Sequence, residues 1–314
     1  CGGGTSKDVL HNAYGYGLFT GGLGLHYGGE LLGCMVVPIS GGNTERQLML
    51  MQDLGSTILC CTPSYALTMV DEAAELGIDI RKLPLRIGLF GAEPWSEGAR
   101  ATVEERMGIS AHDIYGLAEV IGPGVAAECQ AKAGLHIFDD HFIPEVIDPD
   151  TLEPLPPGQR GELVFTCVTK RALPLLRFRT RDITSLNYEP CECGRTQPRM
   201  ERVTGRTDDM LIIRGVNVFP SQIEEVLTKI PGIEPHYQLV LTKEGRLDNL
   251  QIQVEVSPQV FSDEVSRLEQ LAQTIREKVT STLGIRVDVK LVEPKSIERS
   301  IGKAKRVLDL RKEE

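Results

Sequence analysis

Three short segments of the chain combine charged, aromatic and glycine residues in patterns that could bind a nucleotide. Residues 90–95 (FGAEPW) follow an apolar run, where α/β folds place ligand loops. Residues 115–119 (YGLAE) offer an aromatic ring, a glycine and a carboxylate, and residues 177–182 (RFRTRD) end a predicted strand with three guanidinium groups and a second carboxylate. Each segment alone is also compatible with surface ion pairs, so only the three segments together indicate a nucleotide site.

Three further segments follow in order along the chain. Residues 204–209 (TGRTDD) lead into residues 214–220 (RGVNVFP), and residues 300–303 (SIGK) lie near the C-terminus. A lysine in a basic tail is usually solvated, but the glycine that precedes Lys303 would permit a tight approach to a ligand.

A second kind of chemistry is offered by Cys129, His136, Cys191 and Cys193. Three thiolates and an imidazole suit a tetrahedral Zn²⁺ site. We predict a structural zinc with no open position, which would tie two loops of a β subdomain together. The alternative is four unlinked residues in β-rich loops, because the C-x-C spacing has low specificity.

The composition is that of an ordinary globular protein. The 314 residues are 41% hydrophobic and 25% charged, and the formal net charge is −10. This negative charge argues against nonspecific binding to nucleic acid or to anionic membranes, and no apolar run approaches the length of a membrane span. The cysteine usage and the lack of a secretory signal predict a reduced, cytoplasmic protein.

An α/β fold must position these segments. Short apolar runs alternate with helical patterns, which predicts a mainly parallel sheet with crossover helices. We expect strands at residues 31–39, 57–61 and 85–90 and helices at residues 63–76 and 97–107. We expect an antiparallel β subdomain at about residues 140–200, with strands at residues 143–147, 161–166 and 175–178.

The pattern changes after Gly205, where a small α+β unit begins. We expect strands at residues 210–214, 238–242, 251–256 and 287–292 and helices at residues 221–230 and 264–283, with Ser221 as the N-cap of the first helix. The chain therefore predicts two domains, residues 1–207 and 208–314.

The ordered motifs resemble those of the adenylate-forming superfamily of acyl-CoA synthetases, and within it the phenylacetate-CoA ligase family. Residues 14–22 (YGYGLFTGG), 38–44 (PISGGNT) and 211–220 (LIIRGVNVFP) are close to the wording of that family. The resemblance implies a large α/β AMP-binding domain with a β subdomain, followed by a small C-terminal lid domain. It also implies ATP-dependent activation of an aryl carboxylate, most simply phenylacetate, to an acyl-adenylate, followed by transfer to coenzyme A with release of AMP and pyrophosphate.

The resemblance also implies roles for residues of the nucleotide site. Glu119 would help to hold Mg²⁺ between the phosphates, because hard cations prefer carboxylate oxygen. Asp182 would accept hydrogen bonds from the ribose hydroxyls, and Tyr115 and Glu93 would shape the adenine and acyl sites. Arg206 would contact phosphate or ribose oxygens; its alternative role is an ion pair with one of the two aspartates that follow it.

The C-terminal motifs are assigned in the same way. Lys303 would enter the active site during adenylation and contact the α-phosphate and the carboxylate. Asp208 would be the hinge about which the small domain rotates between the half-reactions. Arg214, Gly215 and Phe219 would then help to form the tunnel for the pantetheine arm of coenzyme A.

The aryl pocket would be lined by Tyr14, Phe19, Ala92, Ile114 and Pro123, which match pocket positions of phenylacetate-activating relatives. Aromatic walls suit an aryl acid through edge-to-face contacts. The alternative for each residue is ordinary core packing.

Members of the family carry a Ser/Thr/Gly-rich phosphate loop upstream of the segment that matches residues 14–22. This chain has no such loop, and residues 2–7 (GGGTSK) lack the spacing of a phosphate loop, so we expect an N-terminally truncated ligase that turns over poorly. Two other functions stay open: an adenylating enzyme with a carrier protein or another acceptor, and a non-catalytic fragment that binds a nucleotide or coenzyme A. Relatives are usually homodimers.

Overall fold

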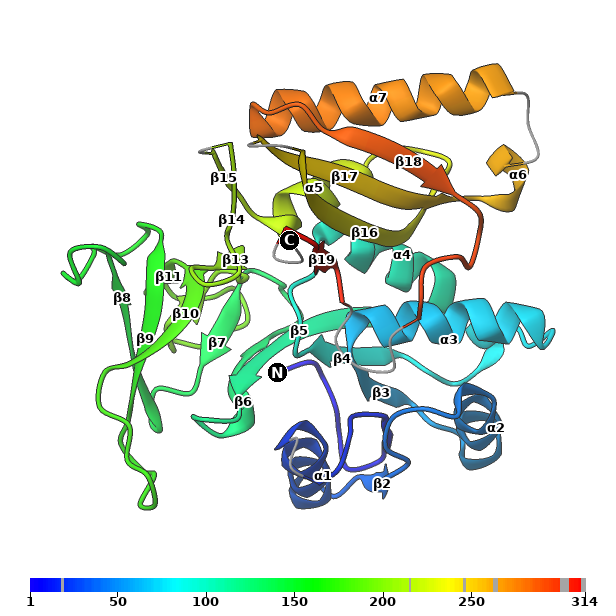
Figure 1. Cartoon of the computed structure of the whole chain (residues 1–314). Helices are drawn as coiled ribbons and strands as arrows, with labels where there is room; N and C mark the ends of the chain where they lie inside the picture. Colours follow the sequence, from blue (N-terminus) through cyan, green and yellow to red (C-terminus); the bar gives the residue numbers. More distant parts are fainter. Residues whose placement is uncertain (18–19, 215, 245–246, 262–264, 300–304, 312–314) are drawn as a thin grey trace. The chain divides into compact units, whose positions relative to one another are not determined.

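The computed structural model describes residues 1–17, 20–214, 216–244, 247–261, 265–299 and 305–311 (Figure 1). Contacts divide the described chain into two compact units. Among the described residues, the first contains residues 1–94 and 101–207, and the second contains residues 95–100, 208–299 and 305–311.

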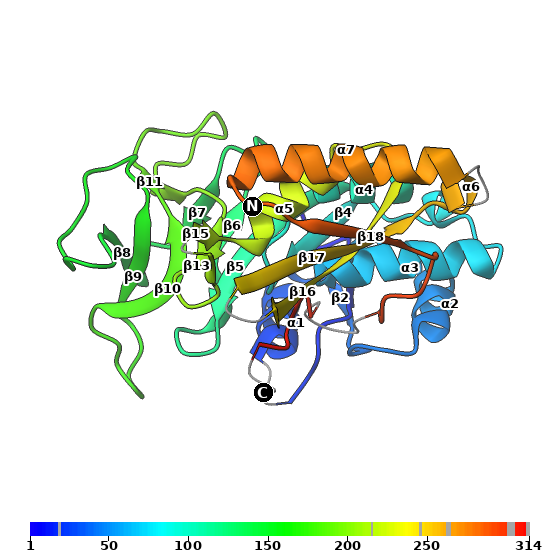
Figure 2. The ribbon, with the colours of Figure 1, turned by 45° about the horizontal axis from the view of Figure 1, so that its top comes forward.

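The first unit is built on a nine-stranded sheet with the order β11-β12-β7-β6-β5-β4-β3-β1-β2. Its strands from β2 to β5 are parallel and alternate along the chain with helices, as the sequence predicted. Helices α2 and α3 lie side by side (Figures 1 and 2). The elements of this half are β1 (Val9–Asn12), α1 (Thr20–Leu32), β2 (Met35–Val37), α2 (Thr44–Leu54), β3 (Ile58–Cys61), α3 (Pro63–Glu75), β4 (Ile87–Gly91), α4 (Glu97–Met107) and β5 (Ser110–Leu117).

The predicted strand at residues 31–39 is wrong for its first half. Leu31 and Leu32 close α1, and only Met35–Val37 forms a strand. Helix α1 was missed because its sequence, TGGLGLHYGGELL, contains five glycines, and glycine is a poor helix former. These glycines allow close packing: a Cβ on Gly24 would lie 2.8 Å from the Pro123 side chain, and one on Gly22 would lie 2.5 Å from the Gly15 carbonyl oxygen.

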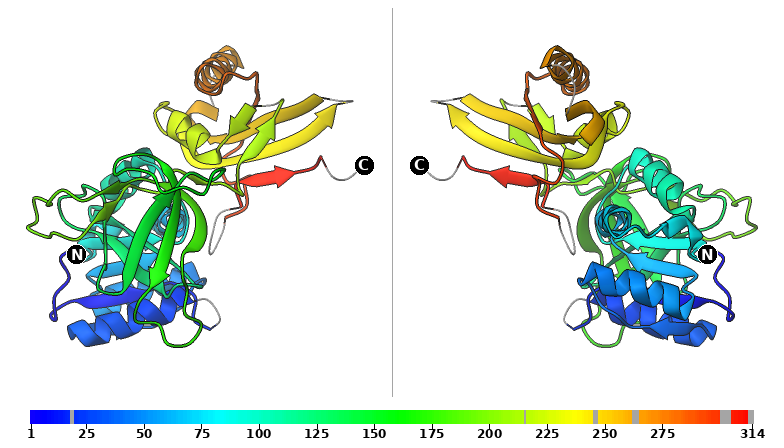
Figure 3. Two further views of the ribbon diagram at one scale, coloured as in Figure 1. Left: turned by 90° about the vertical axis from the view of Figure 1, so that its left-hand side faces the viewer. Right: turned by 90° about the vertical axis from the view of Figure 1, so that its right-hand side faces the viewer.

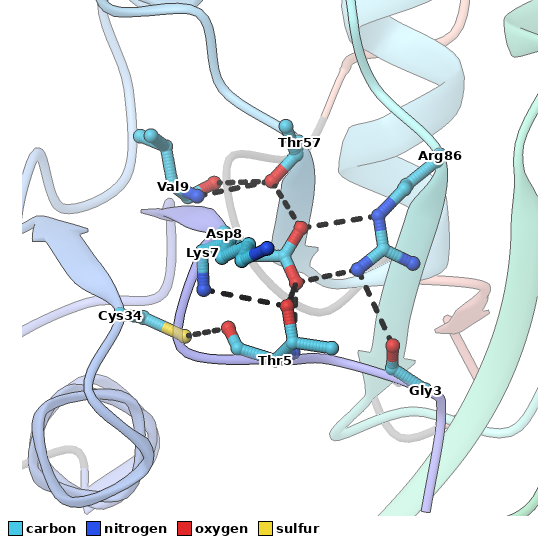
Figure 4. A network of polar contacts seen from close by, with 8 residues as sticks. All are labelled: Gly3, Thr5, Lys7, Asp8, Val9, Cys34, Thr57 and Arg86. Carbon is cyan, nitrogen blue, oxygen red and sulfur yellow. Dashed lines mark hydrogen bonds and ion pairs between the residues drawn. The ribbon is translucent and has the colours of Figure 1, made fainter.

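A polar network at the amino ends of β1, β3 and β4 fixes the N-terminal segment (Figure 4). Asp8 accepts hydrogen bonds from the Thr5 backbone N–H at 2.7 Å, the Thr57 hydroxyl at 2.7 Å and Arg86 Nε at 3.0 Å. Arg86 also donates to the Gly3 carbonyl at 3.3 Å. Burial alone would raise the pKa of Asp8, but hydrogen bonds from Arg86, Thr57 and Thr5 outweigh it and lower the pKa to about 2. Residues 3–8 therefore form a tethered turn.

The rest of the first unit is antiparallel. The nine-stranded sheet continues through β6 (Gly122–Glu128), β7 (Leu135–Ile137), β11 (Leu186–Asn187) and β12 (Arg199–Met200). A separate four-stranded sheet contains β8 (Phe142–Ile147), β9 (Gly161–Cys167), β10 (Phe178–Thr184) and β13 (Gly205–Arg206). The predicted strand at residues 175–178 is thus displaced, since the strand begins at Phe178. Strand β10 therefore contains residues 179–182 (RTRD), whereas the predicted strand ended before them.

The second unit pairs β16 (Ile233–Glu244) and β17 (Leu247–Val256) in a four-stranded sheet of order β18-β17-β16-β19, completed by β18 (Asp288–Val292) and β19 (Val307–Asp309). Helices α5 (Pro220–Leu227) and α7 (Val265–Leu283) cover one face of this sheet (Figure 3). A short helix, α6 (Pro258–Phe261), and a hairpin of β14 (Leu211–Ile213) and β15 (Val216–Val218) complete the unit.

The predicted N-cap of α5 is wrong. The N-cap is Phe219, followed by Pro220 at the first helical position, and the Gln222 side chain accepts the Phe219 N–H at 3.0 Å. Proline at this position needs no donor and has the helical φ angle, so it displaces Ser221 into the helix.

Separate apolar cores stabilise the units. In the second unit, buried side chains of α5 and α7, including Ile223, Ile275 and Val279, pack on Leu239 and Ile252 of the sheet. In the part of the chain that the structure describes, no helix has the length and apolar composition needed to cross a membrane.

Candidate active site

Three side chains predicted to bind the nucleotide meet in the first unit. The Tyr115 hydroxyl donates to Asp182 Oδ2 at 2.5 Å, and Arg206 Nη1 donates to Asp182 Oδ1 at 3.0 Å. The Asp182 side chain is 9% exposed and that of Arg206 is 35% exposed. One largely buried carboxylate therefore joins a phenol on β5 to a guanidinium group on β13.

The strands explain why these groups converge. Asp182 and Arg206 are directly paired residues of the antiparallel strands β10 and β13. The pairing of β10 with β9 shifts between Arg179 and Ile183, and Arg181 has a φ of 70°. Bulges of this kind redirect side chains and are common beside active sites. No local pattern in residues 177–184 predicts this irregularity.

The electrostatics of the cluster favour a neutral tyrosine. Burial raises the pKa of Tyr115 well above its ordinary value, and the neighbouring Asp182 carboxylate raises it further. Tyr115 is therefore a permanent donor to Asp182 at neutral pH. Acceptor oxygens held between a phenol and a guanidinium group are suited to exchanging hydrogen bonds with the hydroxyls of a sugar.

The two predicted glutamates lie on other loops. Glu119 is exposed in the turn between β5 and β6, and its backbone carbonyl accepts a hydrogen bond from Lys170. Glu93 follows β4, and its Oε1 accepts the Ser64 N–H at 2.7 Å at the start of α3. A carboxylate in that position complements the positive end of a helix dipole, so Glu93 has a structural role whether or not it also contacts a ligand.

Three of the residues predicted for the aryl pocket lie in one apolar cluster. Tyr14 is 4% exposed and packs in a group that includes partly buried Ala92 and Ile114. Ala92 has a φ of 70°, a conformation that only a tightly constrained alanine adopts. Pro123 is on β6, opposite Gly116 of β5. The fifth residue, Phe19, lies outside the described residues.

The sequence reasoning missed the polar group that supports the tyrosine-containing loop. Asn12, the last residue of β1, donates from Nδ2 to the Tyr16 hydroxyl at 2.7 Å and to the Gly22 carbonyl at 2.7 Å. These two bonds tie Tyr16 and the first turn of α1 to the end of β1. An asparagine two residues before the first tyrosine of the glycine- and tyrosine-rich motif was the available signal.

The predicted residues of the C-terminal motifs are only partly described. Lys303 and Gly215 lie outside the described residues. Asp208 is exposed and begins the second unit, one residue after Thr207 ends the first. Phe219 caps α5, and Arg214 forms the turn of the β14–β15 hairpin with a φ of 51°.

The predicted metal ligands come together. The ligand atoms of Cys129, His136, Cys191 and Cys193 all lie within 4.8 Å of one another. The Cys129 and Cys191 sulfurs are 3.8 Å apart, and the Cys193 sulfur is 3.5 Å from His136 Nε2. His136 lies on β7 of the nine-stranded sheet, and Cys129 immediately follows β6. The cluster is therefore at one end of the large sheet, not between loops of the four-stranded one.

The charges near the cluster favour a thiolate at Cys193. The Arg195 backbone N–H and guanidinium group donate to its sulfur, which lowers the pKa of Cys193 to about 6. Burial lowers the pKa of His136, so its imidazole is neutral at pH 7. Both are the protonation states that bind a metal.

Comparison with known proteins gives a consistent result. Residues 8–167 match the AMP-binding enzyme family, and residues 215–311 match the C-terminal domain of AMP-binding enzymes. The chain is 54% identical to the phenylacetate-coenzyme A ligase of Thermus thermophilus, over 97% of this chain and 72% of that protein. It is 50% identical to the phenylacetate-coenzyme A ligase of Escherichia coli, over 98% of this chain and 70% of that protein.

A solved structure supports the fold. A crystal structure of 2-hydroxyisobutyryl-CoA ligase in the postadenylation state matches with a TM-score of 0.92 at 31% sequence identity, over 98% of this chain and 66% of that one. The chain thus spans about two thirds of that ligase and somewhat more of the two phenylacetate ligases. The predicted fold class and the resemblance are confirmed. The chain belongs to the AMP-binding enzymes, within the phenylacetate-coenzyme A ligase family of AMP-forming acid–thiol ligases.

Proposed function

We propose that the protein activates an aryl carboxylate, preferentially phenylacetate, with ATP and transfers the acyl group to coenzyme A. The observation that carries this proposal is the meeting of Tyr115, Asp182 and Arg206 in a chain half identical to phenylacetate-coenzyme A ligases. A carboxylate oxygen attacks the α-phosphorus and pyrophosphate leaves. The coenzyme A thiol then attacks the acyl carbonyl, loses its proton, and displaces AMP.

The residues contribute mainly position and charge, as expected for transfer of a nucleotidyl group. Asp182 accepts hydrogen bonds from the ribose hydroxyls. Arg206, which lies beside Asp182, donates hydrogen bonds to ribose or phosphate oxygens. Tyr115 keeps the Asp182 carboxylate in place, and Glu93 shapes the adenine and acyl sites. Glu119 is an exposed carboxylate of the type that holds Mg²⁺, which would neutralise phosphate charge when bound.

The remaining roles belong to the same proposal. Tyr14, Phe19, Ala92, Ile114 and Pro123 form the aryl pocket. In the C-terminal part, Lys303 assists adenylation and Asp208 is the hinge, while Arg214, Gly215 and Phe219 border the path of the pantetheine arm. A cytoplasmic location and a homodimer follow from the same resemblance.

Carboxylate-dependent ATP–pyrophosphate exchange tests the first half-reaction. The panel contains phenylacetate, ring-substituted arylacetates, benzoate and a medium-chain fatty acid. We expect exchange with arylacetates and thioester formation when coenzyme A is added. Exchange without a coenzyme A thioester would favour another acceptor, and nucleotide binding without exchange for any acid would favour a binding protein.

We also propose that the cysteine–histidine cluster binds zinc. Zn–S bonds of about 2.3 Å and Zn–N bonds of about 2.0–2.1 Å at tetrahedral angles separate two sulfurs by about 3.8 Å and a sulfur from a nitrogen by about 3.5 Å. The distances between Cys129 and Cys191 and between Cys193 and His136 agree with these values. All four positions are filled by protein, so the metal would stabilise the β6–β7 connection and the loop before β12.

Metal analysis of protein purified without chelators should give one zinc per chain. Cys191→Ser should lose the zinc and lower the melting temperature, because it removes one of four ligands. Cys34→Ser is the control: Cys34 is buried elsewhere and donates to the Thr5 carbonyl, so this variant should keep its zinc. Wild-type protein free of zinc, with a melting temperature unaffected by chelator, would contradict the proposal.

A further inference from the structure

The β14–β15 hairpin needs external support to hold one position. Each of its strands has three residues, and together they form a separate two-stranded sheet. Isolated two-stranded hairpins are marginally stable in water. Buried Ile213 and Val218 anchor one side of the hairpin in the core of the second unit, whereas Ile212 is 55% exposed.

Arg311 supplies a polar connection between this hairpin and the sheet. Its Nη1 donates to the Ile212 carbonyl of β14 at 3.0 Å and to Asp248 Oδ2 of β17 at 3.2 Å. Its Nε and Nη2 donate to the two carboxylate oxygens of Asp309 at 2.9 Å and 2.8 Å. The side chain is 21% exposed. One planar guanidinium group therefore joins β14, β17 and β19.

Arg214 reinforces the same connection from the turn of the hairpin. Its Nε donates to the Asp248 carbonyl at 2.8 Å, so Asp248 receives one arginine through its side chain and the other through its backbone. Arg214 has a left-handed φ of 51°, a conformation that costs a non-glycine residue free energy and persists only when its surroundings fix it.

We propose that Arg311 is a positioning residue for the thioester-forming half-reaction, through its hold on the β14–β15 hairpin. The inference rests on the proposed function, in which this hairpin borders the path of the acceptor thiol. Arg311 itself touches no reacting atom in this account. Its fork geometry is essential, because a lysine ammonium group is a point charge and cannot bind the Asp309 carboxylate side-on while also reaching Ile212 and Asp248.

The test compares the two half-reactions in Arg311→Lys. We expect thioester formation from a supplied aryl-adenylate and coenzyme A to fall about tenfold or more, mainly in kcat, since small displacements of positioning groups have effects of this order. ATP–pyrophosphate exchange should change less than about twofold, because the hairpin serves only the second step. Asp309→Asn should give a smaller defect of the same kind, and the double variant should be little worse than Arg311→Lys.

Arg276→Lys is the matched control. Arg276 is exposed on α7 of the same unit and donates to Gln273 within its own helix, so both half-reactions should match wild type. Equal losses in both half-reactions of Arg311→Lys would indicate general destabilisation, and unchanged thioester formation would show that Arg311 positions nothing; either result overturns the inference. Failure of wild-type protein to form the thioester would instead reject the proposed function.

Discussion

Two carboxylate–guanidinium pairs of the first unit are made of the same groups but occupy different places in the fold. The side chains of Asp8 and Arg86 are 5% and 44% exposed, and those of Asp182 and Arg206 are 9% and 35% exposed. Burial therefore does not distinguish the pairs. Asp8 and Arg86 lie at the amino ends of parallel strands, whereas Asp182 lies beside a bulge of an antiparallel strand.

The position of each pair in its sheet indicates whether it contributes to stability or to the reaction. In α/β sheets, ligands bind beyond the carboxyl ends of the strands, and the amino ends contribute to stability. Asp8 is bonded to the turn before β1 and to the residues that immediately precede β3 and β4. Asp182 is bonded to a phenol and a guanidinium group that were both predicted as nucleotide-site residues from their resemblance to the ligase family. We therefore expect opposite phenotypes from the two aspartates.

The largest expected effect comes from Asp182→Asn. This variant removes the charge that pairs with Arg206 and that, in the proposed function, accepts hydrogen bonds from the ribose hydroxyls. It should lower ATP–pyrophosphate exchange by about a hundredfold or more, because a misplaced substrate loses reactivity steeply. The midpoint of urea unfolding should stay near that of wild type. Asp150→Asn, which changes an exposed carboxylate in the turn after β8, is the control for charge. If Asp182→Asn exchanged pyrophosphate at the wild-type rate, Asp182 would not be needed for adenylation, and its assignment to the reaction would be wrong.

Asp8→Ala should have the reverse effect. It leaves Arg86 and Thr57 without their shared acceptor, which should lower the free energy of unfolding by about 2–3 kcal/mol, less than for a fully buried pair because Arg86 is half-exposed. Urea unfolding measures this loss. ATP–pyrophosphate exchange per folded molecule should be unchanged at saturating ATP. A variant with normal stability but reduced exchange would show instead that the amino ends of β1, β3 and β4 take part in the reaction.

The smallest expected effect is a pH dependence of the unfolding free energy that identifies Asp8 as the titrating group. The pKa of Asp8 is lowered from 3.8 to about 2 in the folded protein. Its contribution to stability is therefore complete above about pH 4 and is lost as the pH falls toward 2. The difference in unfolding free energy between wild type and Asp8→Ala should be constant from pH 7 to about pH 4 and shrink below it. A difference that shrinks between pH 7 and pH 5 would assign the effect to another group.

Much of the fold could be predicted from the sequence because periodic apolar segments dominate it. Helix α4 begins and ends where expected, and β3 and α3 begin and end within one residue of their predicted bounds, since apolar runs and glycine stops are local signals. Helix α1 could not be predicted, because glycine disfavours helices and the packing of Gly24 against Pro123 involves a residue about one hundred positions away.

In the candidate site, too, some features could be predicted from the sequence and others could not. Family motifs indicated Tyr115, Asp182 and Arg206, and the structure adds the strand pairing that brings them together. The bulge at Arg181 and the capping role of Glu93 depend on contacts between distant segments, which no local pattern encodes.

The glycine-rich helix α1 has a consequence for the order in which the protein folds. Each interior glycine costs about 1 kcal/mol of helix stability relative to alanine, so a segment with five of them has almost no helical tendency on its own. Helix α1 can form only once β1, β2 and β6 offer it a surface, and we expect its amide hydrogens to exchange early among those of the first unit. Tyr14 and Tyr16 lie between β1 and this helix along the chain, so the aryl pocket proposed for this region should be the last part of the unit to assemble and the first to open.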